Sequence, residues 1–218
     1  TRRVADLVPL HRCGARSASP GKRSAAVTLR IQEFTARTLI GQTLIMERLT
    51  GADASFLYME NPVVHMHVTG LMILDPSTVP GGYAFEKFRD LLISRIHLVP
   101  AFRRRLLRVP FGLDHPVWAD DPDFDIDRHL TREQIPAPAG QDDLQDYISD
   151  YASEPLDMDI PLWQMTVIEG FADGSIAIVS KMHHVAVDGS TGTDMLTQLV
   201  DFGPEIRPTP APDVPFDP

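Results

Sequence analysis

The 218-residue sequence contains a single cysteine, Cys13, and lacks long hydrophobic runs. One cysteine excludes an internal disulfide framework and suits a reducing cytosol. No segment approaches the roughly 20 apolar residues that a membrane-spanning helix needs. The strongest early candidate, TLIGQTLIM at 38–46, is short and interrupted by polar residues. We therefore expect a cytoplasmic protein with neither a signal peptide nor a transmembrane anchor.

Motifs for nucleotides and metals are also missing. The sequence has no P-loop and no GxGxxG, so no nucleotide-binding fold is indicated. His65 and His67 share one face of a predicted strand, but no Cys/His cluster completes a zinc site. The alternating aspartates at 120–127 lack the glycine and glutamate of a calcium-binding loop. We expect neither a metal nor a cofactor.

The net charge of −10 is unevenly distributed. Residues 1–45 carry eight Lys or Arg against Asp6 and Glu33, so this leader is positive and the remainder is strongly acidic. An acidic body does not attract nucleic acid, and we expect no nucleic-acid partner. The leader has no sustained apolar period, which predicts a disordered basic extension before a domain that starts at Met46.

Hydrophobic periodicity predicts both strands and helices in that domain. The run at 63–74 is rich in Val, Met, Leu and Ile, which is typical of a strand. Two further apolar runs, 163–171 and 175–182, are joined by ADG and predict a hairpin. The segments 83–96 and 142–152 place apolar residues on one helical face.

A third predicted helix follows residue 189 and carries Met195, Leu196, Leu199 and Val200, while 101–136 reads as an irregular hairpin region. This mixture favours an α+β sandwich with helices packed on a mixed sheet over a doubly wound sheet. Six prolines lie within 204–218, a density typical of a semi-rigid linker. We expect the domain to span 46–203 and a Pro-rich inter-domain linker to follow it.

The segment HHVAVDG at 183–189 joins the last predicted strand to this helix. Adjacent residues on a strand point to opposite faces, so His183 and His184 cannot share one metal site. A neutral imidazole is suited to take a proton near pH 7, and Gly189 permits a sharp turn after Asp188. Spacing alone leaves two interpretations, a general base or a pair with one packed and one exposed histidine.

Four segments together resemble a known family. HHVAVDG is similar to the HHxxxDG signature of the coenzyme-A-dependent acyltransferase superfamily. LTGADASFLYMENPVVHMHVTGL at 49–71 resembles the N-terminal strand region of the bacterial wax ester synthase/diacylglycerol acyltransferase family. PLW at 161–163 resembles its short motif before the dyad, and DGSTGTDMLTQLVD at 188–201 resembles the helix after it. The resemblance covers 46 to about 203.

The resemblance implies a fold and a reaction. The fold is a chloramphenicol-acetyltransferase-like two-layer sandwich, the N-terminal domain of a two-domain acyltransferase. The reaction moves a fatty acyl group from acyl-coenzyme A to the hydroxyl of diacylglycerol or of a long-chain alcohol. It implies that His184 is the general base, that His183 supports the site, and that Asp188 and Gly189 shape the loop. Pro161, Leu162 and Trp163 support packing near the site, with Trp163 either in the core or in the substrate wall.

Members of the family are about twice as long, and their second domain completes the active site, so we expect this chain to be weakly active or inactive unless a C-terminal domain is supplied in cis or in trans. The resemblance adds the inner membrane or lipid inclusions as places of peripheral association. Two alternatives stay open, a non-catalytic lipid-binding remnant and a condensation-type domain that uses carrier-protein thioesters.

Overall fold

The structure, a computed structural model, describes residues 46–187, 195, 198–201 and 207–211 and the backbone of 38–39 and 42–43, with the side chains of 137–139 excepted. The chain divides into two units, Thr1–Thr35 and Ala36–Pro218, and the description concerns the second. Most of the predicted basic extension, most of the predicted linker, and the site candidates Asp188 and Gly189 lie outside the described residues.

A four-stranded mixed sheet forms the centre of the described domain. Its strands are ordered β4 (His67–Leu74), β9 (Ile176–His183), β8 (Trp163–Phe171) and β7 (Leu130–Ala139). The β4–β9 and β9–β8 pairs are antiparallel, whereas β7 and β8 are parallel. The mixed sheet predicted from the sequence is therefore confirmed.

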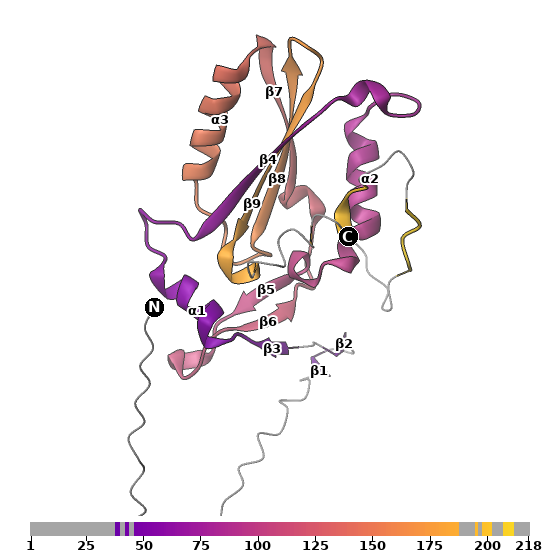
Figure 1. Cartoon of the computed structure of the whole chain (residues 1–218). Coiled ribbons are helices and arrows are strands. Elements are labelled where there is room, and N and C mark those ends of the chain that lie inside the picture. The colour runs from indigo at the N-terminus through magenta and orange to yellow at the C-terminus, as the bar shows by residue number, and fades with distance from the viewer. Residues whose placement is uncertain are drawn as a thin grey trace, which may run out of the picture. The chain divides into compact units, whose positions relative to one another are not determined.

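Helices cover both faces of this sheet (Figure 1). Helix α2 (Phe85–Arg95) packs on one face and α3 (Gln141–Ser153), the crossover between the parallel strands β7 and β8, packs on the other. The α2 side buries Leu92, Val167 and Ile178, with Met72 and Phe88 packed against them, and the α3 side buries Leu144, Tyr151, Ile168, Ala177 and Val179. Successive residues of β8 and β9 alternate between these two cores, as the two-residue period of a strand requires.

A second sheet carries the hairpin predicted within 101–136. Its antiparallel order is β3 (Met46–Arg48), β6 (Val117–Asp120) and β5 (Arg104–Leu107). Short 3₁₀ turns punctuate the chain: η1 (Pro76–Thr78), η2 (Ile96–Leu98), η3 (Pro100–Phe102), η4 (Pro110–Gly112) and η5 (Ile126–Arg128). Two-residue strands β1 (Thr38–Leu39) and β2 (Gln42–Thr43) pair with each other before β3.

The segment 49–71, which the resemblance assigned to a strand region, begins instead with helix α1 (Gly51–Met59). Thr50 caps this helix, because its Oγ1 accepts a hydrogen bond from the backbone N–H of Asp53 at 3.1 Å. Strand β4 starts only at His67, four residues later than the predicted start at 63. The strand prediction for the first half of this segment was wrong.

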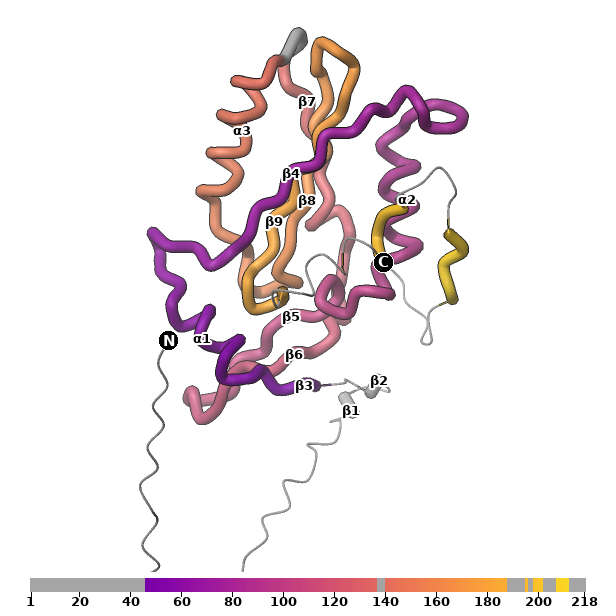
Figure 2. Tube along the Cα trace, in the orientation of Figure 1, coloured from indigo at the N-terminus to yellow at the C-terminus, as the bar shows by residue number. Residues whose placement is uncertain are grey.

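The C-terminal part of the described chain is attached to the end of α2. Met195, Gln198 and Leu199, from the predicted third helix, are helical. Arg95 is buried and donates hydrogen bonds to the carbonyl oxygen of Leu199 and to the carboxylate of Asp201. Residues 207–211 lie beside α2 (Figure 2). No helix in the described part of the chain has the length and apolarity needed to cross a bilayer.

Candidate active site

The two adjacent histidines lie on different elements. Strand β9 ends at His183, and the 3₁₀ turn η6 (His184–Ala186) begins with the next residue. The backbone N–H of His183 donates to the carbonyl of Leu162 at 3.0 Å, and that of His184 donates to the carbonyl of Met66 at 2.8 Å. The two imidazoles are separated because the strand ends between them, rather than because successive strand residues point to opposite faces.

The imidazole of His183 is fully buried and is bonded at both nitrogens. Its Nδ1 accepts a hydrogen bond from the backbone N–H of Val185 at 3.0 Å, and its Nε2 lies 3.0 Å from Oε2 of Glu60. Because Nδ1 accepts, the neutral ring carries its hydrogen on Nε2 and donates it to Glu60. Burial lowers the pKa of His183, although Glu60 acts in the opposite direction. These contacts make His183 a neutral, fixed part of the scaffold.

The imidazole of His184 is partly exposed and is held by stacking. It lies parallel to the ring of Phe56, with centroids 4.9 Å apart and an interplanar angle of 13°. Among the described residues, neither ring nitrogen of His184 has a hydrogen-bond partner, whereas both nitrogens of His183 are occupied. Of the pair, His184 therefore has the nitrogen that can accept a proton from a bound molecule.

Helix α1 and the residue that follows it contact the two histidines. Phe56 of α1 stacks on His184, and Glu60, directly after the helix, lies against His183. The sequence analysis selected neither residue. The T-x-x-D pattern at Thr50–Asp53 is a helix-start signal that could have revealed α1, but nothing in the sequence indicates which side chains of α1 meet the dyad.

The predicted PLW motif packs against the segment that carries the dyad. Leu162 is 1% exposed and packs with Leu49, Ala54 and Val185, in addition to accepting the backbone hydrogen bond from His183. Pro161 is also buried, and its carbonyl accepts the N–H of Trp163 at 2.9 Å. The motif thus supports the loop that carries His184.

Trp163 belongs to the core. Its indole Nε1 donates to the carbonyl of Phe102 at 2.9 Å, and its ring stacks on Phe102 and on His129. With 1% of its surface exposed, it does not reach a substrate wall in this domain. Of the two roles considered for Trp163, the structure supports packing.

His65 and His67 form a second histidine pair. Their rings are stacked, with centroids 5.6 Å apart, and Nδ1 of His65 lies 3.9 Å from Oε1 of Glu60. Nε2 of His67 donates to the carbonyl of Ala152 at 2.8 Å, and burial lowers the pKa of His67. No group of three or more potential metal ligands occurs within the described residues. His65 thus lies close to Glu60, which also contacts His183.

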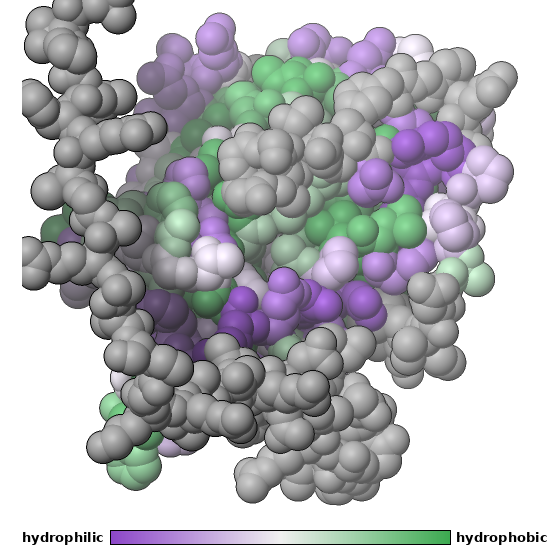
Figure 3. Space-filling view, turned by 60° about the horizontal axis from the view of Figure 1, so that its bottom comes forward, coloured by the Kyte–Doolittle hydropathy of each residue, from purple (hydrophilic) through white to green (hydrophobic). Residues whose placement is uncertain are grey.

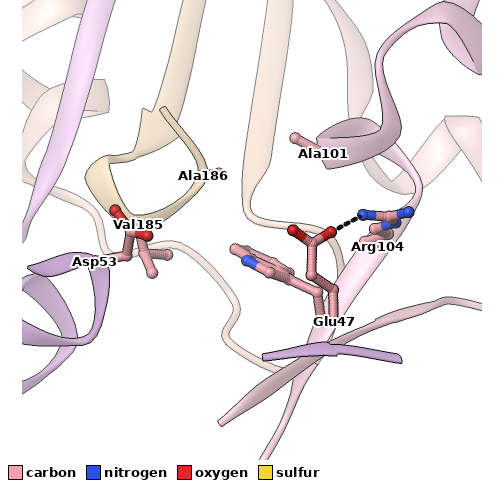
Figure 4. A pocket seen from close by; sticks show the side chains of 7 residues that line it. Glu47, Asp53, Ala101, Arg104, Val185 and Ala186 are labelled. Carbon is pink, nitrogen blue, oxygen red and sulfur yellow. Dashed lines mark hydrogen bonds and ion pairs between the residues drawn. The ribbon is translucent and has the colours of Figure 1, made fainter. Parts of the chain in front are cut away.

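A small cavity of about 230 Å³ lies between η6 and the sheet formed by β3, β6 and β5 (Figure 4). It is lined by Glu47, Asp53, Ala101, Arg104, Trp118, Val185 and Ala186. Nη1 of Arg104 forms a 2.8 Å ion pair with Oε2 of Glu47 on one side of the cavity (Figure 4). Ligand sites for drug-sized molecules occupy about 300–1,000 Å³. We therefore do not assign the acyl chain to this cavity.

A larger open groove of about 1010 Å³ lies between α1 and the β5–β6 hairpin. Half of its lining residues carry apolar side chains, namely Leu57, Leu106, Leu107, Val109, Pro116 and Met158, whereas Glu60, Arg108, Asp114 and Asp159 are charged. Glu60, the partner of His183, also lines it. The groove therefore connects an apolar surface with the residues that support the dyad.

Comparison with known proteins gives consistent matches. Residues 49–218 match the model of the wax ester synthase/diacylglycerol acyltransferase catalytic domain. Two Mycobacterium tuberculosis proteins named as diacylglycerol O-acyltransferases are 40% identical over 173 residues and 44% identical over 168 residues. These matches cover 79% and 77% of this chain but 36% and 33% of the relatives. The chain thus spans about a third of the length of these relatives.

Solved structures show the same fold. The wax ester synthase/diacylglycerol acyltransferase of Marinobacter aquaeolei VT8 is 29% identical, with a TM-score of 0.64, over 77% of this chain and 40% of that one. The first condensation domain of the CDA synthetase shares the fold at 16% identity, with a TM-score of 0.55, over 71% of this chain and 38% of that one. The α+β class and the N-terminal half of a two-domain architecture are confirmed. The chain belongs to the wax ester synthase/diacylglycerol acyltransferase family.

Proposed function

We propose that this chain carries the general base of an acyl transfer from acyl-coenzyme A to the hydroxyl of diacylglycerol or of a long-chain alcohol. The observation that carries the proposal is the contrast between the two histidines. His183 is buried and bonded at both nitrogens, whereas His184 is partly exposed and stacked on Phe56, without a partner at its ring nitrogens among the described residues.

The reaction requires one proton acceptor. The hydroxyl oxygen of the acceptor attacks the thioester carbonyl carbon while His184 takes the hydroxyl proton. The tetrahedral intermediate then collapses, the carbon–sulfur bond breaks, and the coenzyme A thiolate receives the proton from the imidazolium. An ester and free coenzyme A result, and no bond to the protein forms. The imidazole of His184 is thereby regenerated at the end of each cycle.

His183 and Glu60 act as positioning residues in this proposal. The hydrogen bond from the N–H of Val185 to Nδ1 of His183 fixes η6, the turn that presents His184. Glu60 accepts the hydrogen of Nε2 and thereby selects the tautomer that can make this bond. Asp188 and Gly189, which lie outside the described residues, are proposed to shape the loop after this turn.

The remaining partners are inferred from the family. Acyl-coenzyme A is a co-substrate, and neither a bound cofactor nor a nucleic-acid partner is part of the proposal. Since the chain spans about a third of its relatives, the rest of the substrate site is assigned to a C-terminal domain supplied in cis or in trans. A water-insoluble acceptor also favours peripheral association with the inner membrane or with lipid inclusions.

The test is acyl transfer by the purified chain, alone and together with the C-terminal part of a Mycobacterium tuberculosis relative. Labelled long-chain acyl-coenzyme A is offered with diacylglycerol or with a fatty alcohol. We expect background rates from the chain alone and ester formation with the added part. His184→Ala should lower the rate roughly 100 to 10,000-fold, and His183→Ala less.

His97→Ala is the matched control, because His97 is partly exposed and contacts the carbonyl of Pro210 away from the dyad. Equal loss in His97→Ala and His184→Ala would contradict a base role for His184. Transfer only from a carrier-protein thioester would identify the condensation-type alternative. Acyl-chain binding without any transfer, with the added part present, would identify a lipid-binding remnant.

A further inference from the structure

The loop between β5 and β6 exposes two large apolar side chains at its tip. Phe111 is 96% exposed and Leu113 is 80% exposed, the largest and third-largest values among the exposed large hydrophobic residues of the described chain. Single exposed apolar residues are common on protein surfaces, but a nearly bare phenylalanine next to a bare leucine is not. These side chains contribute nothing to the core of the domain.

The backbone of the loop is held in a conformation that keeps Phe111 outside. Phe111 has φ 60° and ψ 10°, in the left-handed region, and Gly112 follows with φ 63°. The turn is closed by hydrogen bonds from Gly112 N–H to Val109 O at 3.1 Å and from Leu113 N–H to Pro110 O at 3.4 Å. This region is strained for a bulky residue, and no packing of the side chain offsets the strain.

The loop is fastened to the groove that reaches Glu60. His115 Nδ1 lies 2.8 Å from the hydroxyl of Tyr58 on α1, and Arg48 of β3 pairs with Asp114 at 2.7 Å. Val109 and Gly112 line the groove from the loop side. The exposed tip therefore stands at one end of an apolar groove whose lining includes the partner of His183.

The charges around the tip favour an anionic or zwitterionic partner. Asp114 is the only acidic residue of the loop at 108–116, and Arg48 already pairs with it. Arg108 is exposed and has no ion-pair partner in the part of the chain that the structure describes. A cation beside two bare apolar side chains matches a lipid surface, where phosphate lies above hydrocarbon.

The end of the domain that carries this hairpin has a mixed surface. With that end turned forward, green hydrophobic patches are bordered by purple hydrophilic side chains (Figure 3). Stable protein interfaces of standard size bury about 800 Å² on each partner. Two projecting side chains on a mixed surface are too small a patch for such an interface. They fit the insertion of a loop tip into lipid better.

We propose that the 108–116 loop is a membrane-docking element that inserts Phe111 and Leu113 into a lipid surface and turns the groove toward it. Arg108 contacts the headgroup phosphates. The acceptor alcohol, which is soluble in lipid, then has a short apolar route along Leu106, Val109 and Leu57 toward the dyad. The route for the acceptor alcohol rests on the proposed function, whereas the docking of the loop to lipid is independent of it.

The experiment measures co-sedimentation of the purified 218-residue chain with vesicles made only of phosphatidylcholine. Neutral lipid is chosen because the positively charged residues 1–45 would bind anionic vesicles by themselves. Phe111→Ser and Leu113→Ser should each weaken binding roughly tenfold, since each removes the transfer of one large apolar side chain. Ile73→Ser, at an exposed apolar position on the edge of the other sheet, should not change binding.

A second measurement does not require a variant that binds vesicles more weakly. Phe111→Trp adds a fluorophore at the tip, and vesicles should shift its emission to shorter wavelength and allow quenching by brominated phosphatidylcholine. The parent chain, with buried Trp163 and part-buried Trp118, supplies the background. No substrate is present, so a failure of docking is separate from a failure of acyl transfer.

Four outcomes would overturn the proposal. The first two are absence of binding by the parent chain and equal binding by the parent and by the Phe111→Ser, Leu113→Ser double variant. The third is a tryptophan emission of Phe111→Trp that vesicles leave unchanged, and the fourth is an emission already shifted without lipid once the C-terminal part of a relative is added. That result would assign the loop to a contact between domains.

Discussion

Nε2 of His183 lies 3.0 Å from Oε2 of Glu60, although the two residues are 123 positions apart in the chain. The bond ties the end of α1 to the end of β9, the two elements that meet at the dyad. A buried donor that loses its acceptor pays the cost of desolvation without compensation. The pair is therefore the contact whose removal should most directly disturb the site.

We expect Glu60→Ala to lower the free energy of unfolding by about 1–3 kcal/mol, because Nε2–H of His183 is left without an acceptor. Glu60→Gln retains an acceptor oxygen and should cost less. Urea unfolding followed by tryptophan fluorescence measures both, with Glu86→Ala, at an exposed position on α2, as the control. Equal midpoints for Glu60→Ala and the parent would show that the pair contributes no stability.

Stability should also fall in mild acid. Burial is the main cause that lowers the pKa of His67, His129 and His183 from the ordinary value of 6.5. These rings stay neutral in the folded protein, whereas the unfolded chain binds protons below about pH 6.5. The stabilisation is therefore complete above that pH and is lost as the pH falls through the lowered pKa values.

Each histidine contributes at most ~1.4 kcal/mol per pH unit to this loss. Unfolding by urea at a series of pH values gives the slope, and NMR titration of the imidazole protons identifies the groups. A His183 resonance that titrates with a pKa of 6.5 or above would contradict the burial argument.

The ion pair between Arg95 and Asp201 should fasten the C-terminal segment. Arg95 is 1% exposed, and its Nη2 lies 2.6 Å from Oδ2 of Asp201. The other carboxylate oxygen, Oδ1, accepts from Nε of Arg207 at 2.7 Å. These two guanidinium groups lower the pKa of Asp201 to about 2. Asp201→Ala leaves a buried cation without its partner and should cost ~3 kcal/mol or more.

The exposed pair Arg89–Asp127 supplies the control for this variant. Asp127→Ala should cost less than about 1 kcal/mol, because surface pairs contribute little. Limited proteolysis with a glutamate-specific protease gives a second readout, since cleavage after Glu205 should become faster only in Asp201→Ala. Equal cleavage in both variants would show that the segment is held by other contacts.

The conformation of Phe111 predicts a stabilising substitution. Phe111→Gly removes a left-handed φ from a bulky residue without loss of packing and should raise the free energy of unfolding by about 1 kcal/mol. Leu113→Gly, at φ −70°, should give no such gain and serves as the control. If the loop docks to lipid, Phe111→Gly gains stability and loses vesicle binding. A drop in stability would show that Phe111 packs against the domain.

The sequence predicted the parts of the fold in which pattern and chemistry agree. Alternating burial in 163–171 and 175–182 and the helical faces of 83–96 and 142–152 correspond to β8, β9, α2 and α3. Strand β7 was missed, because Arg132, Glu133 and Gln134 interrupt any apolar period. Its pairing depends on the parallel neighbour β8, a long-range contact that local sequence does not carry.

The same distinction applies to the site. HHVAVDG and PLW mark a loop and its support from spacing and resemblance. Phe56 and Glu60 have no unusual local pattern, and they gain a role only because α1 lies against η6. The side chains of Lys181 and His67 donate hydrogen bonds to carbonyls at the end of α3, and the sequence did not predict these contacts either. Their partners lie 27 to 85 residues away.

The pairing of β4 with β9 has a consequence during synthesis. Strand β4 is made early, but its hydrogen-bonding partner follows more than a hundred residues later. At about 5–20 residues per second, Glu60 is made roughly 6 to 25 s before His183. Until β9 is made, Leu71 and Ile73 belong to an unpaired apolar edge, which is prone to pair with other chains. Nascent chains that stall before β9 should therefore depend on chaperones more than chains that stall after it.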